Sequence, residues 1–242
     1  MYALNKENLK QSAKRMAGNK AVGIDEVTKQ EYIQDLDNNI TRLVEEMKKL
    51  SYRPKAVRRV YIPKTGSDKK RPLGIPAFED KIVQDVMTQI LNAIYEPMFK
   101  EFSFGFRPNR NCHQAIAYLD MMLHRKKVNY VVDLDIKGFF DNIDHEWLIK
   151  FLEYRIKDRV YIRYVKRFLK SGIMEQGKLL KSEIGTPQGG IISPVLGNIY
   201  LHFVLDDWFE KVVKKQTKSY AGMVRYAAVS YTHLTLPTNS RV

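Results

Sequence analysis

The sequence predicts an α+β fold, in which amphipathic helices alternate with a few short strands. Apolar residues recur at helical spacing in 28–47 and again in 78–99, the pattern of helices that bury one face. The segment 58–75 holds two β-prone runs around Pro-Lys-Thr-Gly-Ser-Asp, which indicates a hairpin. Residues 130–136 form a short, β-branched apolar run, which is typical of a buried strand.

Composition favours a basic protein that binds a polyanion. The 242 residues include 41 Lys and Arg against 27 Asp and Glu, a net charge of +14, and 44% are hydrophobic. Such an excess favours RNA, DNA or an acidic membrane surface as partner. No apolar run is long enough to cross a bilayer, and the N-terminus is too polar for a signal peptide. The single cysteine, Cys112, excludes an internal disulfide and a cysteine-based zinc cluster, which fits a reducing cytosol.

The first third of the chain is predicted to pass from helices to a basic hairpin. Residues 5–19 are helix-compatible and basic, and Thr28 with Glu31 forms a capping box for the next helix. The segment 48–71 then contains ten Lys or Arg and one acid, Asp68. Such a hairpin suits a phosphate chain, although an edge strand protected by lysines would show similar charges.

The middle of the chain combines packing signals with a second basic segment. A helix over 78–99 should end at Pro97, and another should cover 112–125. Between them, residues 102–110 interleave aromatic side chains with Arg. That pattern suits a nucleic acid and equally suits a packed loop.

The stretch 130–146 carries the strongest chemical signal. Asp133 and Asp135 lie two apart on the expected strand, so both project from the same face. A hard metal ion would compensate a carboxylate there, although a strand-edge acid and a helix cap are equally ordinary roles. Phosphatases of the haloacid dehalogenase type also carry D-x-D after a strand. Lys137 stands here where Thr or Val usually follows in those enzymes.

Beyond this stretch, a charged helix over 147–170 is followed by a hairpin-like segment and the loop Gly185-Thr186-Pro187-Gln188-Gly189-Gly190. The Pro and Gly residues indicate a tight loop in which the backbone approaches something closely. A further helix over 191–209 and a strand beginning at Met223 complete the pattern.

The order of motifs resembles the reverse transcriptases encoded by group II introns. The resemblance runs from about Ser12 to Ala227 and includes six blocks in order. They are AGNKAVGID, RRVYIPKTGSDKKRPLGIP, FSFGFRPNRNCHQAI, DLDIKGFFDNIDH, GTPQGGIISPVLGNIYL and MVRYA.

The resemblance implies the fingers and palm of a right-hand polymerase, with an antiparallel palm sheet packed on helices and the thumb absent. Fingers with an N-terminal extension would cover 1–125, and a truncated palm 126–227. The implied reaction is attack of a primer 3′-OH on an incoming dNTP, with RNA as template and two Mg²⁺ ions as cofactors. The implied partners are group II intron RNA, an RNA template with a DNA primer, and dNTP, in the cytoplasm of a bacterium. The oligomeric state stays open, with a homodimer as one alternative.

The resemblance also assigns site residues. Asp135 matches the first catalytic, metal-binding aspartate, to which the backbone carbonyl of Ile136 would add a ligand, and Asp133 is then structural. The nucleotide-binding residues would be Lys64 and Arg71, which grip the triphosphate, Phe139 and Phe140, which form an aromatic wall, and Gln188 of the loop. Within that wall, Phe140 matches the residue that excludes a ribose 2′-OH. The nucleic-acid-binding residues would be Arg58, Arg59, Arg107 and Arg110.

The chain departs from the family where its last palm hairpin should carry Tyr-Ala-Asp-Asp. Tyr226-Ala227 is followed here by Ala228-Val229, and 228–242 match nothing expected, which suggests a tail that is not native. One carboxylate cannot hold two divalent ions about 4 Å apart, so we expect this chain to be inactive or nearly so. The alternative function is an RNA-binding maturase module that assists intron splicing without polymerising.

Overall fold

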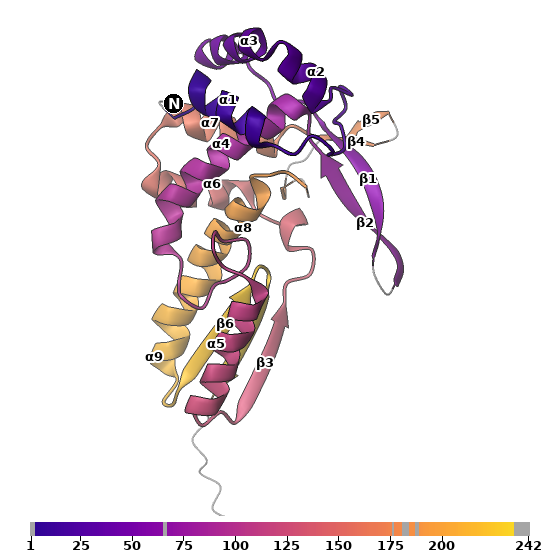
Figure 1. Ribbon diagram of the computed structural model, residues 1–242. Helices are drawn as coiled ribbons and strands as arrows, with labels where there is room; N and C mark the ends of the chain where they lie inside the picture. The colour runs from indigo at the N-terminus through magenta and orange to yellow at the C-terminus, as the bar shows by residue number, and fades with distance from the viewer. Residues whose placement is uncertain (1–2, 65–66, 176, 181–183, 187–188, 235–242) are drawn as a thin grey trace, which may run out of the picture. The chain divides into compact units, whose positions relative to one another are not determined.

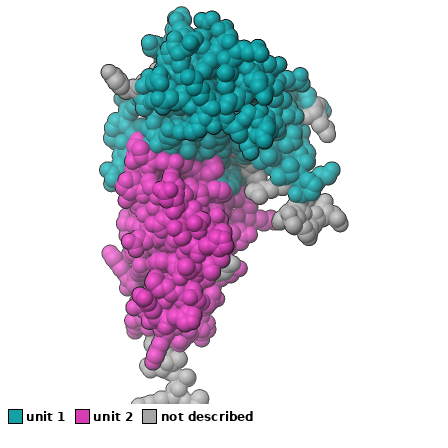
Figure 2. Space-filling model, in the orientation of Figure 1, with its two compact units in different colours: residues 1–91, 140–193 teal, residues 92–139, 194–242 magenta. Residues whose placement is uncertain are grey.

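The computed structural model describes residues 3–64, 67–175, 177–180, 184–186 and 189–234 (Figure 1). The chain divides into two compact units, Met1–Leu91 with Phe140–Ser193 and Asn92–Phe139 with Pro194–Val242 (Figure 2). These are unit 1 and unit 2, respectively. The expected boundary between fingers and palm, after residue 125, falls inside unit 2, and that division stays a prediction.

Unit 1 contains helices from three separate parts of the chain. Their bounds are α1 Lys6–Arg15, α2 Lys29–Gln34, α3 Leu36–Lys48, the first part of α4 Phe78–Tyr95, α6 His145–Arg155 and α7 Arg159–Leu169. The capping box of Thr28 and Glu31 is confirmed. The single helix expected over 28–47 is wrong, because Asp35 leaves the helical region (φ −124°, ψ 45°) and separates α2 from α3.

A four-stranded sheet in unit 1 contains the basic hairpin. Strands β1 Val57–Lys64 and β2 Ser67–Ile75 pair antiparallel, which confirms the hairpin predicted from the sequence. The short strands β4 Ile173–Glu175 and β5 Lys178–Leu180 extend the sheet in the order β2-β1-β4-β5. The helices form the core of the unit, in which Leu9, Ile40, Ile82, Leu152 and Tyr164 are fully buried.

Unit 2 is built around a three-stranded antiparallel sheet in the order β3-β7-β6. The strands are β3 Tyr130–Asp135, β6 Ala221–Tyr226 and β7 Val229–Leu234. The helices are the end of α4, α5 Cys112–Arg125, α8 Ser193–Leu201, and two π-helical turns, His202–Asp206 and Phe209–Val213, before α9 Lys214–Gln216. The mixture of helices and sheets in the two units confirms the α+β prediction.

Strand β6 is covered on both faces. Met223 packs with Phe102 and Phe209, whereas its neighbour Val224 packs with Phe104 and Met122 of α5. Successive side chains of a strand point to opposite faces, so one strand can serve two apolar clusters. Figure 1 shows α5 lying along this sheet.

Strand β3 is exposed, and the prediction of a buried strand is wrong. Val131 is 57% exposed and Leu134 42%, and every residue of the strand is classed as exposed. The reason is position: β3 lies at the sheet edge and pairs only with β7 among the described strands. The apolar clusters form instead on β6.

Residues 229–234 are integrated into the sheet although they follow the last family motif. As β7, they pair with β3 on one side and with β6 on the other. The proposal that 228–242 is a foreign tail is not tested by this pairing and stays a prediction. No helix in the described part of the chain is long and apolar enough to cross a membrane.

Candidate active site

Asp135 lies at the end of β3, beside the tight turn that joins β6 to β7. It is in register with Val229, and Val229 is also the partner of Tyr226 across the hairpin. The next residue, Ile136, donates its N–H to the carbonyl oxygen of Ala228 over 3.4 Å. The structure therefore brings Asp135 and Ile136 to the two positions, 228 and 229, where the family motif would place acids.

A buried ion pair stabilises this turn. The Arg225 guanidinium is fully buried and donates to both carboxylate oxygens of Asp206 over 2.7 Å. It also donates to Asn198 Oδ1 over 3.0 Å and to the carbonyl oxygen of Ala227 over 3.1 Å. Charge-assisted, bidentate hydrogen bonds of this kind fix geometry closely. The turn is thereby held to the π-helical segment that contains Asp206.

The loop before α5 packs directly against the same turn. Phe104 donates its N–H to the carbonyl oxygen of Arg225, and Arg225 donates its own to Phe102, both over 2.8 Å. Gly105 approaches so closely that a Cβ there would lie 2.2 Å from the Ala227 nitrogen. Ala227 itself adopts the left-handed region (φ 57°), as tight hairpin turns require. Sequence reasoning missed this support, because its members are far apart in the chain.

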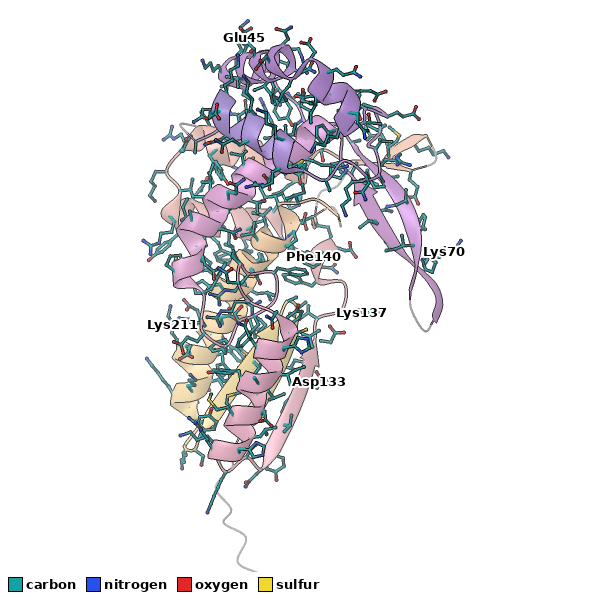
Figure 3. All side chains as sticks on the ribbon, in the orientation of Figure 1. Glu45, Lys70, Asp133, Lys137, Phe140 and Lys211 are labelled. Carbon is teal, nitrogen blue, oxygen red and sulfur yellow. The ribbon has the colours of Figure 1, made fainter. Side chains whose placement is uncertain are left out.

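The donor set around Asp135 does not fit a pair of divalent ions. Asp133 and Asp135 are both exposed on β3, where Figure 3 labels Asp133. Ala228 and Val229 offer no side-chain oxygen. Within the described residues, no group of three or more His, Cys, Asp and Glu side chains is placed to hold a metal ion. Two-metal sites need several bridging carboxylates, so the site in this chain is incomplete.

The two neighbouring aromatic residues, Phe139 and Phe140, belong to different units. Phe139 is buried in unit 2, with its ring edge-on to Tyr200 at 6.3 Å. In unit 1, the carbonyl oxygen of Phe140, labelled in Figure 3, accepts the Thr186 N–H over 2.7 Å. The Gly185 N–H donates to the carbonyl oxygen of Ile143. Gly185 has a φ of +80°, and a Cβ on it would lie 2.6 Å from the carbonyl oxygen of Asp141. The Gly185-Thr186 end of the PQGG loop thus packs on the turn after β3.

The two residues predicted to grip the triphosphate lie on the hairpin, and Gln188, also predicted to bind the nucleotide, belongs to the PQGG loop. Lys64 ends β1, and Arg71 on β2 is in register with Ile62. Gln188 lies outside the described residues. Its neighbour Gly189 (φ +104°) approaches β2 so closely that a Cβ there would lie 2.2 Å from the Gly74 oxygen. The described end of the loop therefore meets β2, three residues from Arg71.

The four arginines predicted to bind nucleic acid all make contacts within the protein. Arg58 donates twice to the Val22 carbonyl, at 3.1 and 2.7 Å, and Arg59 pairs with Glu175 at 3.2 Å. Arg107 is 8% exposed and pairs with Glu96 at 2.8 Å. Arg110 donates to the Glu101 carbonyl over 2.7 Å and lies over the Phe104 ring. These contacts give the four side chains packing roles, and their binding of nucleic acid stays a prediction.

Comparison with known proteins agrees with the motif order. A family model described as reverse transcriptase (RNA-dependent DNA polymerase) matches residues 62–227. The group II intron-encoded protein LtrA of Lactococcus lactis subsp. cremoris is 45% identical over 166 residues, which cover 69% of this chain and 27% of LtrA. An uncharacterized 91 kDa protein in the cob intron of Schizosaccharomyces pombe is 37% identical over 185 residues, 76% of this chain and 22% of that protein.

Structural comparison gives the same fold. A chain of a partial Cas6-RT-Cas1–Cas2 complex superposes with a TM-score of 0.55 at 17% identity, covering 96% of this chain and 37% of that one. The chain thus spans about a quarter of the length of its intron-encoded relatives. More than half of its residues match the family model, in agreement with the six ordered motifs. The chain therefore belongs to the reverse transcriptase (RNA-dependent DNA polymerase) family, in the branch of the group II intron-encoded proteins.

Proposed function

We propose that this chain is the fingers and palm of a group II intron-encoded protein that copies RNA into DNA by adding dNTPs to a primer 3′-OH. The position of Asp135 carries this proposal. It lies at the end of β3 and in register with Val229, beside the hairpin turn at which the family's two further aspartates belong. Members of this family use divalent metal ions, and we infer Mg²⁺ for the longer protein.

The remaining assignments follow the same matching. Asp135 and the Ile136 carbonyl would contribute metal ligands, whereas Lys64, Arg71, Phe139, Phe140 and Gln188 would contact the nucleotide. The contact between Gly189 and β2 supports a shared role for the PQGG loop and the hairpin. Finger cations such as Lys64 and Arg71 suit a triphosphate because ammonium and guanidinium groups bind phosphate oxygens strongly.

The chain itself is proposed to be inactive, because Ala228 and Val229 stand where carboxylates are needed. The supporting turn is nevertheless intact, since Arg225 holds the Ala227 carbonyl and Asp206. Restoring two carboxylates should therefore restore the chemistry without rebuilding the scaffold.

The test is a double variant, Ala228→Asp with Val229→Asp, compared with the chain as it stands. We expect the double variant to bind Mn²⁺ measurably by electron paramagnetic resonance and to extend a DNA primer on RNA by at least one nucleotide. A third variant that adds Asp135→Asn should lose both signals. Equal extension by the unrestored chain would refute the metal-site argument. Unchanged Mn²⁺ binding in the double variant would refute the placement of Asp135.

A second candidate function is RNA binding that assists intron splicing without polymerisation. The net charge of +14 favours it, because most of the affinity of such proteins for RNA comes from phosphate contacts. Intron-RNA binding that persists in this chain, with primer extension absent even after the carboxylates are restored, would favour this maturase function. The proposed partners are group II intron RNA and a primed RNA template with dNTP, in the bacterial cytoplasm.

A further inference from the structure

A cationic cleft of about 580 Å³ lies on unit 1, along one side of α7. Pro54 and Ser171 are part of its lining, and the basic residues of the lining are Arg53, Arg163, Lys166, Arg167 and Lys170. Among the described residues that line it, none is acidic and none is aromatic. Apart from Arg53, which belongs to the basic segment 48–71, none of these basic residues was assigned a function by the sequence.

The cleft is built on a rigid helix face. Positions 163, 166, 167 and 170 follow the i, i+3, i+4, i+7 spacing that places side chains along one side of a helix. The opposite side of α7 is buried, with Tyr164, Val165 and Phe168 almost fully excluded from solvent. At 1.5 Å per residue, the row of cations extends about 10 Å. The charges are thus displayed along a straight ridge that the core keeps in place.

Arg167 differs from the other four cations because its guanidinium serves the fold. It donates to the Tyr52 carbonyl over 2.7 Å and to the Leu50 carbonyl over 2.8 Å, and it lies over the Tyr164 ring at 5.2 Å. These bonds hold the segment before β1 against α7. Because that segment continues into Arg53, Arg167 positions a fourth cation in the lining of the cleft.

The remaining four cations have no acidic partner in the part of the chain that the structure describes. On the last helical segment of unit 2, by contrast, Lys211 pairs with Asp207 and Lys214 pairs with Glu210, in each case four residues earlier. Like charges at i and i+4 repel one another, and Arg163 and Arg167 stand at this spacing within α7. A cluster of like charges that has no acidic neighbour in its lining is expected at a binding site for an anion.

We propose that this cleft binds the sugar–phosphate backbone of structured, double-helical RNA, at a site other than the nucleotide and metal positions described above. The absence of aromatic side chains from the described lining argues against base stacking, which is how proteins usually hold single strands. Cations alone recognise phosphates without reading sequence. Three unpaired cations along about 10 Å, with Arg53 in the same lining, suit two to three consecutive phosphates of one strand.

The experiment compares two triple variants of the full chain with equal loss of charge. The cleft variant is Arg163→Gln, Lys166→Gln and Lys170→Gln, and all three side chains are exposed. The control variant is Lys127→Gln, Lys215→Gln and Lys218→Gln, which are exposed residues of unit 2. Fluorescence anisotropy measures binding of a 20-base-pair RNA hairpin and of a 20-nucleotide single strand, from 50 to 300 mM KCl.

We expect the cleft variant to bind the hairpin at least tenfold more weakly at 150 mM KCl, with the control variant within threefold of the unchanged chain. Each phosphate contact adds about 0.9 to the slope of log K against log salt, so the cleft variant should lose about 2 to 3 from that slope. The single strand should be affected less than the hairpin. The melting temperature should stay the same or rise, because like-charge repulsion on α7 is relieved.

Three results would overturn the proposal. Equal losses in the two triple variants would show that total charge, and not the cleft, governs binding. An unchanged salt slope in the cleft variant would show that its cations meet no phosphates. Binding of labelled poly-glutamate is measured in the same way, and its loss in the cleft variant with no loss of hairpin binding would assign the cleft to an acidic protein. None of these readouts requires polymerisation, so failure of the proposed polymerase function leaves this test intact.

Discussion

The two edge strands of the unit 2 sheet, β6 and β3, differ in burial and in the partners of their charged residues. On β6, Arg225 is fully buried, bonded to Asp206 and Asn198, and covered by apolar clusters on both faces of the strand. On β3, Asp135 is exposed, and so are the apolar residues that precede it. One edge is therefore buried and bonded to neighbouring elements, whereas the other exposes its two carboxylates, Asp133 and Asp135.

The comparison separates the contacts that support the β6–β7 turn from the acids that we propose for its chemistry. Gly105, Asn198 and Asp206 all serve the backbone at Arg225–Ala227, although positions 228 and 229 carry no acid. Those contacts lie within the family-matched segment of the chain. Stability and activity should therefore respond to different residues.

The largest effect is expected from Arg225→Ala on the β6 side. Removing one member of a buried ion pair leaves Asp206 uncompensated, which typically costs about 3–5 kcal/mol of unfolding free energy. Urea denaturation followed by circular dichroism measures this loss. Arg225→Lys serves as the conservative control and should recover part of it, because one amine cannot reproduce the bidentate geometry. A loss below 1 kcal/mol for Arg225→Ala would remove the distinction between the two edges.

A second buried acid, Asp80 in unit 1, can be compared with Asp206. Asp80 is hydrogen-bonded by neutral donors, whereas Asp206 is paired with a cation. Tyr52 donates its hydroxyl to one carboxylate oxygen, and the Lys55 N–H donates to the other over 2.9 Å. Burial raises the pKa of Asp80 to about 7, although the hydrogen bonds from Tyr52 and Lys55 act in the opposite direction. The Asp206 carboxylate, by contrast, faces a guanidinium.

The pH dependence of stability follows from this raised pKa. The folded chain binds the Asp80 proton more tightly than the unfolded chain, whose Asp pKa is about 4. The protonated Asp80 therefore contributes about 1–4 kcal/mol to the unfolding free energy. This contribution is fully present below pH 4 and is lost as the pH rises through 7. Urea denaturation between pH 4 and 8 should show Asp80→Asn losing this dependence. Parallel curves for the unchanged chain and the variant would contradict the assignment.

Local sequence signals predicted those parts of the fold whose partners are close in the chain. The capping box at Thr28 and the hairpin of β1 and β2 are both confirmed. The position of Asp135 beside the turn agrees with the family match as well. Each of these depends on residues within a few positions of one another or on an ordered motif.

Features that depend on sheet order or on distant partners were not predictable in this way. The β-branched run of β3 has the composition of a buried strand, but burial is decided by which neighbour covers it, and β3 lies at an edge. The Arg225–Asp206 pair joins residues 19 positions apart through a tertiary contact. The helical spacing of Arg163, Lys166 and Lys170 is visible in the sequence, yet their cleft needs Arg53, more than a hundred positions earlier.

The smallest effect is expected from Asp135→Asn, at the exposed edge. Its side chain is exposed, so the substitution should change the unfolding free energy by less than about 0.5 kcal/mol, as is usual for surface positions. The measurement is the same urea titration used for Arg225→Ala, so the two edges are compared on one scale.

In the background of Ala228→Asp with Val229→Asp, the same change should instead stabilise the fold in the absence of metal. Three carboxylates gathered at one turn repel one another, and removing one charge relieves that repulsion. If Asp135→Asn left the unfolding free energy unchanged in both backgrounds, Asp135 would not share a site with positions 228 and 229. The contacts that support the β6–β7 turn would then serve a purpose other than metal-dependent chemistry.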